Sequence, residues 1–313
     1  MTQPKLQPMV GRFRRHLGPL LVSFALAAAS CTSAQPTAVE EPGAAFPNDR
    51  IYLVCGNDDG APNELTGCSV GFDGSFEQLG NDVRTLTQPV MNPEGTLIAF
   101  AEPGGDIVLR TPSGSNDLSL SLPDLSGPLD WSHDGRYLLL SDRSALAVVD
   151  LDETRRSGAE RIERFDLPER HDVLGLARFS PDGRFLAVGT KQSDLDQDEA
   201  YRVVLIDRSD GSQQWFGEQV VQRDPTRFTG TFADPAFDMS GAYLAWADGL
   251  SGEVSVLTVA TGEVERLKLA EPPELITGVS WSPSGLIAVG VNARLRLVNP
   301  ANGMTVTEPL PSD

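Results

Sequence analysis

One short pattern occurs five times in this chain of 313 residues, and it limits the possible folds more than any other feature. Each copy begins with an apolar residue, continues with a mainly polar stretch and ends in glycine, and a run of apolar residues follows. The copies lie at residues 90–95, 131–135, 179–183, 237–241 and 281–285. Their glycines are 40, 48, 58 and 44 residues apart. A repeat of this period that begins with a tight turn is typical of a β-propeller.

Each copy has the chemistry of a hairpin turn between two strands. Pro181, in the copy Phe-Ser-Pro-Asp-Gly, presets φ at about −65°, and Gly183 accepts the positive φ at which the chain reverses. The strand after each turn is apolar almost throughout instead of alternating, as expected when a strand is buried on both faces. These strands are predicted at Leu97–Ala101, Tyr137–Leu140, Phe185–Val188, Tyr243–Trp246 and Leu286–Val289.

Every repeat continues in the same order after this second strand. A third, apolar or alternating strand leads to a turn that contains glycine, and a more polar fourth strand completes the unit. A sixth, degenerate copy lies upstream, where Phe46–Arg50 precedes the apolar run Ile51–Val54. Six units over residues 43–310 need about 45 residues each, which is ordinary for this architecture. We therefore predict an all-β fold, a six-bladed β-propeller of four-stranded antiparallel blades.

The clearest copy of the pattern runs from Phe179 to Ala187 and reads aromatic-Ser-Pro-Asp-Gly-basic-aromatic-Leu-Ala. It resembles the repeats of TolB-type, WD-repeat-like β-propellers, and the resemblance covers roughly residues 43–310. The chain departs from TolB itself, since nothing before residue 43 is expected to form that protein's separate N-terminal domain. The resemblance implies the fold and leaves the activity open, because one fold serves many functions. TolB's partners are therefore not carried over to this chain.

The first 30 residues have the features of a bacterial lipoprotein signal peptide. They contain four basic and no acidic residues, and the apolar run 17–29 is too short to span a bilayer as a mature helix. Small residues directly precede Cys31 and resemble a lipobox, in which the cysteine becomes the acylated first residue. Ordinary cleavage nearby and an uncleaved anchor are the alternatives. Residues 31–42 are predicted as a flexible tether, and residues 43–313 as the β-propeller domain.

The two remaining cysteines are predicted to form a disulfide bond. Cys55 ends the second strand of the degenerate first unit, and Cys68 begins its third strand. Neighbouring antiparallel strands can bring two Cβ atoms within bonding range, and an exported chain meets an oxidising compartment. A bond that closes so short a loop would stabilise the fold by roughly 3 kcal/mol. Two free thiols are the alternative.

The chain is strongly acidic, with 25 basic and 44 acidic residues and a formal net charge of −19. Removal of residues 1–30 takes away four basic residues, so the mature chain would carry 21 basic against 44 acidic residues, a net charge of −23. This balance disfavours nucleic acid and anionic phospholipid as partners of the domain itself. It is compatible with a cationic partner, with divalent cations, or with a high-salt habitat.

Residues with the spacing of a catalytic or metal site are scarce. The three histidines are His16 in the signal segment, His133 in a turn and His171 in a connection. Without clustered cysteines they predict neither a zinc nor a haem site, so we expect no metal and no cofactor. A lactonase- or lyase-type enzyme would need convergent carboxylates and a metal around the channel, and the sequence places neither. We therefore predict that the protein is not an enzyme.

The longest connections are predicted on one face of the disc, which marks that face as the candidate binding side. They are 56–66, 168–175, 189–200 and 218–233, whereas 151–161 is expected on the opposite face. The candidate binding residues within them are the carboxylates Asp194, Asp196 and Asp198 and the basic and aromatic group Arg223, Arg227 and Phe228. A solvated acidic loop, which lacks the glycine and the final glutamate of an EF-hand, and a long loop packed on the disc are the alternatives.

Together these features predict a lipoprotein that is anchored in the cell membrane or outer membrane and faces the periplasm or the exterior. Its expected role is that of a non-enzymatic protein-binding or scaffolding module for another cell-envelope protein. The alternative is a propeller that binds or senses a small ligand, a saccharide or a cation. A lactonase- or lyase-type enzyme is the least favoured reading.

Overall fold

The computed structural model confirms an all-β chain built from antiparallel sheets. It describes residues 50–308 with internal gaps, of which the longest are 57–64, 79–88 and 223–231, and the rest of the chain lies outside the description. Among the described residues, five sheets have four strands and one has three. Strands adjacent in sequence are adjacent in each sheet, so every sheet is an up-and-down meander.

The sheets are numbered here in chain order. The first contains β1 (Arg50–Gly56), β2 (Leu65–Gly71) and β3 (Phe76–Gln78). The second contains β4 (Val90–Met91), β5 (Ile98–Ala101), β6 (Ile107–Arg110) and β7 (Asn116–Leu120). The third contains β8 (Gly127–Trp131), β9 (Tyr137–Ser141), β10 (Ala145–Asp150) and β11 (Ile162–Asp166).

The remaining three sheets each have four strands. The fourth contains β12 (His171–Phe179), β13 (Phe185–Ser193), β14 (Asp198–Asp207) and β15 (Gln213–Gln222). The fifth contains β16 (Phe232–Phe237), β17 (Tyr243–Asp248), β18 (Glu253–Thr258) and β19 (Glu263–Lys268). The sixth contains β20 (Ile276–Trp281), β21 (Ile287–Val291), β22 (Arg294–Val298) and β23 (Thr305–Glu308).

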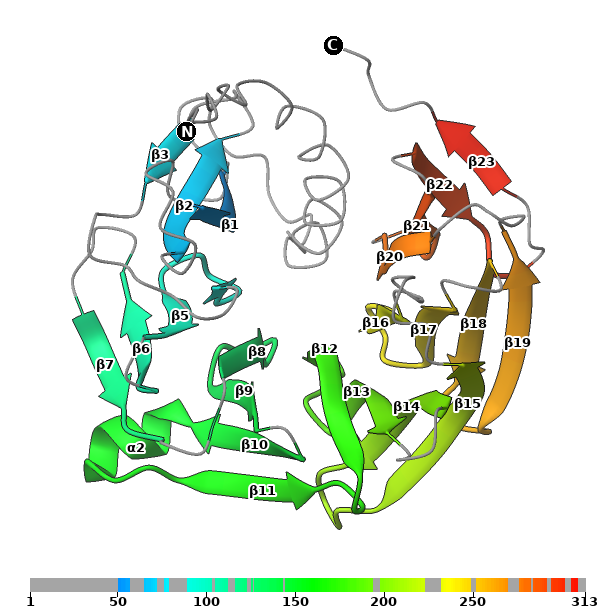
Figure 1. Cartoon of the computed structure of the whole chain (residues 1–313). Coiled ribbons are helices and arrows are strands. Elements are labelled where there is room, and N and C mark those ends of the chain that lie inside the picture. The colour runs from blue at the N-terminus through cyan, green and yellow to red at the C-terminus, as the bar shows by residue number, and fades with distance from the viewer. Residues whose placement is uncertain are drawn as a thin grey trace, which may run out of the picture.

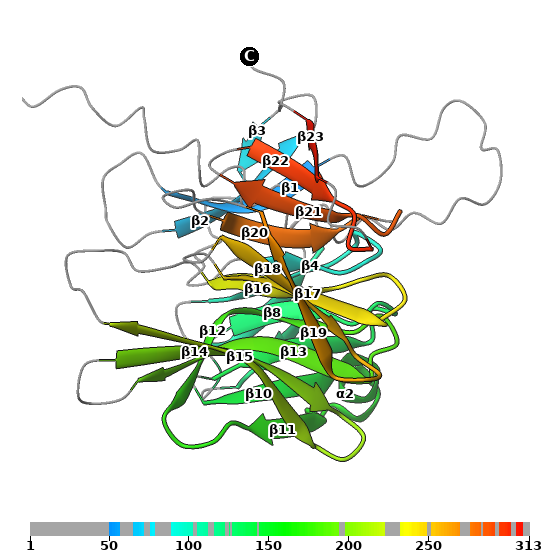
Figure 2. The same ribbon diagram turned by 90° about the vertical axis from the view of Figure 1, so that its right-hand side faces the viewer.

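The sheets stand around a common axis (Figure 1). The first strand of each four-stranded sheet lies nearest this axis and the fourth strand lies outside, as β8 and β11 illustrate. Around the ring, β4 packs beside β8, β8 beside β12, β12 beside β16, and β16 beside β20. The side view shows these sheets edge-on, one beside the next (Figure 2). Radially arranged four-stranded meanders are the architecture of a β-propeller.

Burial within a sheet follows the predicted gradient from the axis to the rim. All six residues of β10 are buried, whereas four of the five residues of β11 are exposed. The apolar cores lie between adjacent sheets: Leu138 of β9 packs in one cluster with Ala99 and Leu109, and Leu139 packs in the next cluster with Leu186. Alternate side chains of one strand therefore serve two interfaces, which explains why these strands are apolar throughout.

A repeated set of hydrogen bonds builds the turn after each innermost strand. In the fourth sheet, the Ser180 N–H donates to Phe185 O, the Phe185 N–H donates to Ser180 Oγ and the Gly183 N–H donates to Ser180 O, each at 2.8 Å. Gly183 has φ of 70°, a conformation that is costly for residues with a Cβ. The same side-chain bond to the start of the next strand recurs at Asn92, Ser132, Asp238 and Ser282. The serine of the pattern is thus a structural part of the turn.

Three predicted connections are shorter in the structure than the sequence indicated. The bounds 168–175 are wrong because β12 begins at His171. The bounds 189–200 and 218–233 are wrong because β13 continues to Ser193, β14 begins at Asp198 and β15 continues to Gln222. These extensions pair with each other, with Ser193 opposite Glu199 and Asp198 opposite Gln222. Pairing with a neighbouring strand outweighs the weak intrinsic β-propensity of such polar residues.

The degenerate first unit is described from its second strand onward. The strands β1, β2 and β3 agree with those predicted at 51–54, 67–72 and 75–79 to within three residues at each end. The predicted turn at 46–49 and the strand before it lie outside the described residues. The number of blades therefore stays a prediction.

Candidate functional site

The disc has two faces that differ in their connections. The turns that follow the innermost strands emerge on one face, which we name the turn face. Because the strands of each sheet are antiparallel, the connections from second to third strands emerge on the opposite face, which we name the loop face.

A pocket with a volume of about 130 Å³ lies on the turn face. It is lined from four sheets, and since β4 and β16 are not neighbours in the ring, the pocket lies on the axis. The residues that line it all come from the ends of innermost strands and the turns after them. They are Met91, Pro93, Asp130, Trp131, His133, Arg178, Phe179, Ser180, Pro181, Ala236, Phe237, Asp238 and Met239.

The lining of the pocket includes an ion pair between two adjacent sheets. Asp130 and Arg178 occupy the same position of the repeat, directly before the aromatic residue, and Arg178 Nη1 lies 3.6 Å from Asp130 Oδ1. Asp130 Oδ2 accepts the backbone N–H of Phe179 at 2.9 Å, and Arg178 Nη1 donates to the Leu129 carbonyl at 3.2 Å. These bonds tie β8 to β12 at the edge of the pocket.

The environment of this pair changes the acidity of the carboxyl group. Asp130 and Arg178 each expose only 16% of their side chains. Burial raises the pKa of Asp130 above its usual range, because desolvation disfavours the charged form, while the charge of Arg178 and the N–H groups of Phe179 and Trp131 act in the opposite direction. Two opposite charges in one poorly solvated place leave this part of the pocket close to neutral.

The walls of the pocket are apolar and held in place. Trp131 and Phe179 are buried, and the Trp131 indole N–H donates to the Val90 carbonyl of the preceding sheet at 3.1 Å. Trp281 makes the equivalent bond to Ala236 O at 2.9 Å between the fifth and sixth sheets. Met239, which lines the pocket from the turn after β16, is 45% exposed. The pocket thus has fixed aromatic walls and an adaptable methionine where it meets solvent.

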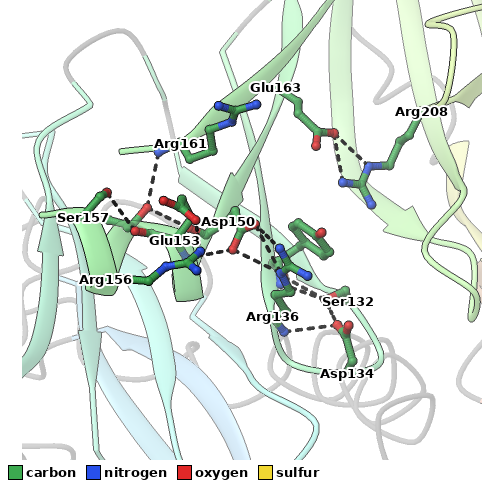
Figure 3. Close-up of polar contacts among 12 residues, drawn as sticks. Ser132, Asp134, Arg136, Asp150, Glu153, Arg156, Ser157, Arg161, Glu163 and Arg208 are labelled. Carbon is green, nitrogen blue, oxygen red and sulfur yellow. Dashed lines mark hydrogen bonds and ion pairs between the residues drawn. The ribbon is translucent and has the colours of Figure 1, made fainter. Parts of the chain in front are cut away.

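The rim of the turn face carries a short helix that was not predicted from the sequence, α2 (Leu151–Ser157) (Figure 3). The Asp150 carboxylate caps it by accepting the Glu153 N–H at 3.0 Å and pairs with Arg136 Nη2 at 2.5 Å. The Leu151 N–H donates to the carbonyl of Arg136, which directly follows the turn glycine Gly135. Segment 151–161 therefore lies on the face opposite the long connections, as predicted.

Most of the predicted site residues fall outside the described part of the chain. These are the predicted lipidation site Cys31 and the candidate binding residues Asp194, Asp196, Arg223, Arg227 and Phe228. Asp198 is described as the first residue of β14 and lies opposite Gln222, the last residue of β15. The described strand ends Asp198 and Gln222 therefore pair on the loop face, whereas the pocket lies on the turn face.

The register of β1 and β2 determines how far apart the two cysteines of the predicted disulfide bond lie. Cys55 lies opposite Thr66 and Cys68 opposite Leu53, so the cysteines are diagonal neighbours on one face of the sheet. The Cα atoms of diagonal neighbours are about 7–8 Å apart, whereas a disulfide requires about 4.4–6.8 Å. The bond stays a prediction, and its formation requires these strands to move closer.

Other chemical signals fit structural roles. Gly67–Gly71 has the Gly-x-Ser-x-Gly spacing of a nucleophile elbow, but it lies within β2 and pairs with β1 instead of forming a strand-to-helix turn. His133 is exposed beside the pocket, and His171 is buried against Trp215 with a ring distance of 4.7 Å. In the part of the chain that the structure describes, no group of three or more His, Cys, Asp or Glu residues could hold a metal ion. That part also contains no helix with the length and apolarity needed to span a bilayer.

Sequence reasoning missed the pocket because it treated the repeated pattern only as turn chemistry. The signal was present in the position before each aromatic residue. Four of the five copies carry small or oppositely charged residues there, namely Asp130, Arg178, Ala236 and Ser280, and the first has Val90. An acid and a base at the same position of adjacent repeats predict a pair that faces the axis.

No protein family model matches this chain, and no curated protein matches its sequence. The fold, in contrast, is similar to solved structures. Hydrazine synthase of Kuenenia stuttgartiensis aligns with a TM-score of 0.55 and 16% identity over 86% of this chain and 80% of that chain. The β-propeller domain of Cps50 (Swd1) from Myceliophteria thermophila aligns with a TM-score of 0.50 and 20% identity over 72% of this chain and 70% of that chain.

TolB from Acinetobacter baumannii aligns with a TM-score of 0.49 and 20% identity, over 85% of this chain and 65% of the TolB chain. At identities this low, similarity is evidence of fold and not of function. The alignment with the Cps50 (Swd1) β-propeller domain therefore shows that this chain has a β-propeller fold.

Proposed function

We propose that this chain is a six-bladed propeller lipoprotein that is tethered by Cys31 outside the cytoplasm and binds another cell-envelope protein without catalysing a reaction. In this proposal, the pocket on the turn face receives one side chain of the partner as an anchor. The observation that carries the proposal is the size and lining of the pocket.

The size of the pocket favours a side chain over a free small molecule. Small-molecule sites usually have volumes of about 300–1,000 Å³, and an apolar cavity of about 150 Å³ binds benzene. The pocket here has about 130 Å³, enough for one ring-sized group. A saccharide would leave most of its surface outside, whereas a protein that inserts one side chain could contact the surrounding face as well.

The lining favours protein binding for a second reason. Aromatic residues and methionine are enriched in the buried centres of protein interfaces. Here Trp131, Phe179, Phe237 and two methionines surround the pocket. Tyr243, which is 43% exposed and stacks on Trp281 with a centroid distance of 6.2 Å, adds apolar surface on the same face.

The polar groups of the pocket favour binding over catalysis. Asp238 is held by its own turn, because it accepts the N–H groups of Ser240 and Tyr243 and the Ser240 hydroxyl. Asp130 is engaged by Arg178 and Phe179. Both carboxylates are thus held in place by contacts within the fold, whereas a lactonase or lyase needs several carboxylates that converge on a substrate or a metal.

Cross-linking of the tagged chain in its own envelope tests this function. Met239→Glu places a charge beside the pocket and should reduce capture of the partner by roughly 30-fold, the effect of losing an interface anchor. Ala260→Glu is the matched control, since Ala260 is exposed on the same face in the turn between β18 and β19. It should leave capture nearly unchanged.

A variant of the loop face shows which result would contradict the proposal. A combined variant with Arg223→Ala, Arg227→Ala and Phe228→Ala should capture the partner as well as the unchanged chain does. If that variant loses the partner while Met239→Glu keeps it, the binding face is the loop face and the proposal is wrong. Cys31→Ser tests the tether separately, because it should release the chain from the membrane fraction or block its processing.

A further inference from the structure

The pocket contains an acceptor whose capacity is only partly used. A carboxylate can accept about four hydrogen bonds. The described contacts of Asp130 are the Phe179 N–H at 2.9 Å, the ion pair with Arg178 at 3.6 Å and the nearby Trp131 N–H. The side chain lines the pocket and remains 16% exposed there. A group bound in the pocket can therefore donate a hydrogen bond to Asp130.

The charges around Asp130 favour a neutral donor. A cation that reached Asp130 would also approach Arg178, and an anion that reached Arg178 would approach Asp130, because the two groups are 3.6 Å apart. Either ion would be attracted by one group and repelled by the other, so the pair offers little net attraction to offset the loss of the ion's water. A neutral hydroxyl group loses less on desolvation and still satisfies the acceptor.

The apolar part of the pocket indicates what should carry this hydroxyl. Trp131, Phe179 and Phe237 supply aromatic surface, and the volume of about 130 Å³ is close to that of cavities that bind a single benzene ring. A ring that ends in a hydroxyl group fits both features. Among side chains, this combination is a phenol.

We propose that the pocket selects a tyrosine side chain of the partner, with its ring against the aromatic walls and its phenol hydroxyl donating to Asp130. This inference rests on the proposed function for the identity of the partner as a protein. The chemistry of the pocket can nevertheless be tested without that partner.

The experiment uses p-cresol and toluene, which are the side chains of tyrosine and phenylalanine with a hydrogen in place of the Cα. The chain is labelled on its methionine methyl groups, and the signals of Met91 and Met239 report binding, since both residues line the pocket. We expect p-cresol to bind about tenfold more tightly than toluene, as for a hydrogen bond to a charged acceptor. The methyl ether 4-methylanisole, which keeps the oxygen and lacks the donor, should bind no better than toluene.

Two variants assign the preference to Asp130. Asp130→Ala should remove it, and alanine is tolerated at this repeat position, as Ala236 of the fifth sheet shows. Ser240→Ala, in a turn next to the pocket, should retain it. Equal binding of p-cresol and toluene to the unchanged chain would overturn the proposal, and so would a preference that survives Asp130→Ala. The comparison of probes on the unchanged chain remains decisive if Asp130→Ala fails to fold.

The two proposals fail in different ways. If p-cresol is preferred but Met239→Glu still captures the partner, the proposed function is wrong and the chemistry of the pocket stands. If capture depends on Met239 but the three probes bind equally, the pocket is an anchor site without selectivity for tyrosine.

Discussion

The turn face and the loop face are made by the same sheets, but the sequence specifies them differently. On the turn face, four of the five described turns join residues five apart, such as Ser180 and Phe185, through the same pair of hydrogen bonds. On the loop face, the connections from second to third strands differ in length. The shortest is residues 292–293 and the longest is residues 57–64. A constant turn places equivalent residues of neighbouring sheets at the same height, so that they can meet at the axis. Connections of different length give no such register.

This difference indicates where in a propeller sequence a candidate binding site is most easily detected. Long connections are tolerated on a surface whether or not they bind anything, so length alone is an ambiguous signal. A residue that differs between otherwise equivalent repeat positions is more informative, because the backbone around it is the same in each repeat. Asp130 and Arg178 are two such residues, and they lie on the turn face, which the lengths of the connections did not indicate.

The largest predicted change in stability concerns the loop face. Cys55 lies there, next to the connection between β1 and β2. If Cys55 and Cys68 are bonded, Cys55→Ser with Cys68→Ser should lower the free energy of unfolding by about 3 kcal/mol, because the bond constrains the unfolded chain. Unfolding by denaturant under oxidising and reducing conditions measures this. The bond would require β1 and β2 to move closer locally, which hydrogen exchange in residues 50–71 would detect.

The double variant is its own control under reducing conditions, where it should match the unchanged chain. Two thiols that both react with an alkylating reagent in the folded, oxidised protein would contradict the bond. The loop face would then lack this covalent tie, and its first connection would depend on strand pairing alone.

The sequence was sufficient for the order of the strands and the turns. Apolar runs after each glycine mark strands buried on both faces, and that pattern needs no knowledge of the neighbours. The helix α2 could also have been predicted, because its boundaries carry standard signals: Asp150, the acidic pair Asp152 and Glu153, and the final Gly158. The extensions of β13 and β15 could not have been predicted, because their polar residues become strands only through pairing.

The pocket could not be predicted from any single repeat. The charged residues Asp130 and Arg178 are 48 positions apart, and each alone looks like an ordinary residue at the end of a strand. Their meeting follows from the packing of β8 beside β12. Only the alignment of equivalent repeat positions around the ring brings the acid, the base and the aromatic walls together.

A smaller effect tests whether the turns are more rigid than the loops. Gly183 in a turn and Gly105 on the loop face have φ of 70° and 89°, and a Cβ added to either would meet no atom closer than 3.7 Å. The cost of Gly183→Ala therefore comes from the backbone and should be about 1–2 kcal/mol. Gly105→Ala should cost roughly half as much, because the Gly183 turn has the bond from the Phe185 N–H to Ser180 Oγ in addition to the two backbone bonds that close both segments. Thermal unfolding compares them, and equal costs would mean that the turn is no more rigid.

The smallest expected effect distinguishes the rim of the turn face from its axis. Asp207, at the end of β14, accepts Arg184 Nη2 at 2.6 Å and the Ser209 N–H at 2.9 Å, and these bonds lower its pKa to about 2. The Asp130 pKa is shifted in the opposite direction by burial. One carboxylate therefore stabilises the fold by being charged, whereas the other is opposed by its own desolvation.

The two carboxylates should respond oppositely to acid. Because the folded pKa of Asp207 is lowered, its contribution is complete above the unfolded value of about 4 and is lost as the pH falls through about 2. Asp207→Asn should cost about 1 kcal/mol near neutral pH, a small effect because Arg184 exposes 58% of its side chain, and the cost should shrink steadily as the pH falls through this range. For Asp130→Asn the stability of the unchanged chain relative to the variant should increase as the pH falls, since a raised pKa favours the protonated folded state. Urea unfolding of both variants across this range measures the slopes. Slopes of the same sign would show that axis and rim are solvated alike, and that the pocket does not bury its charge.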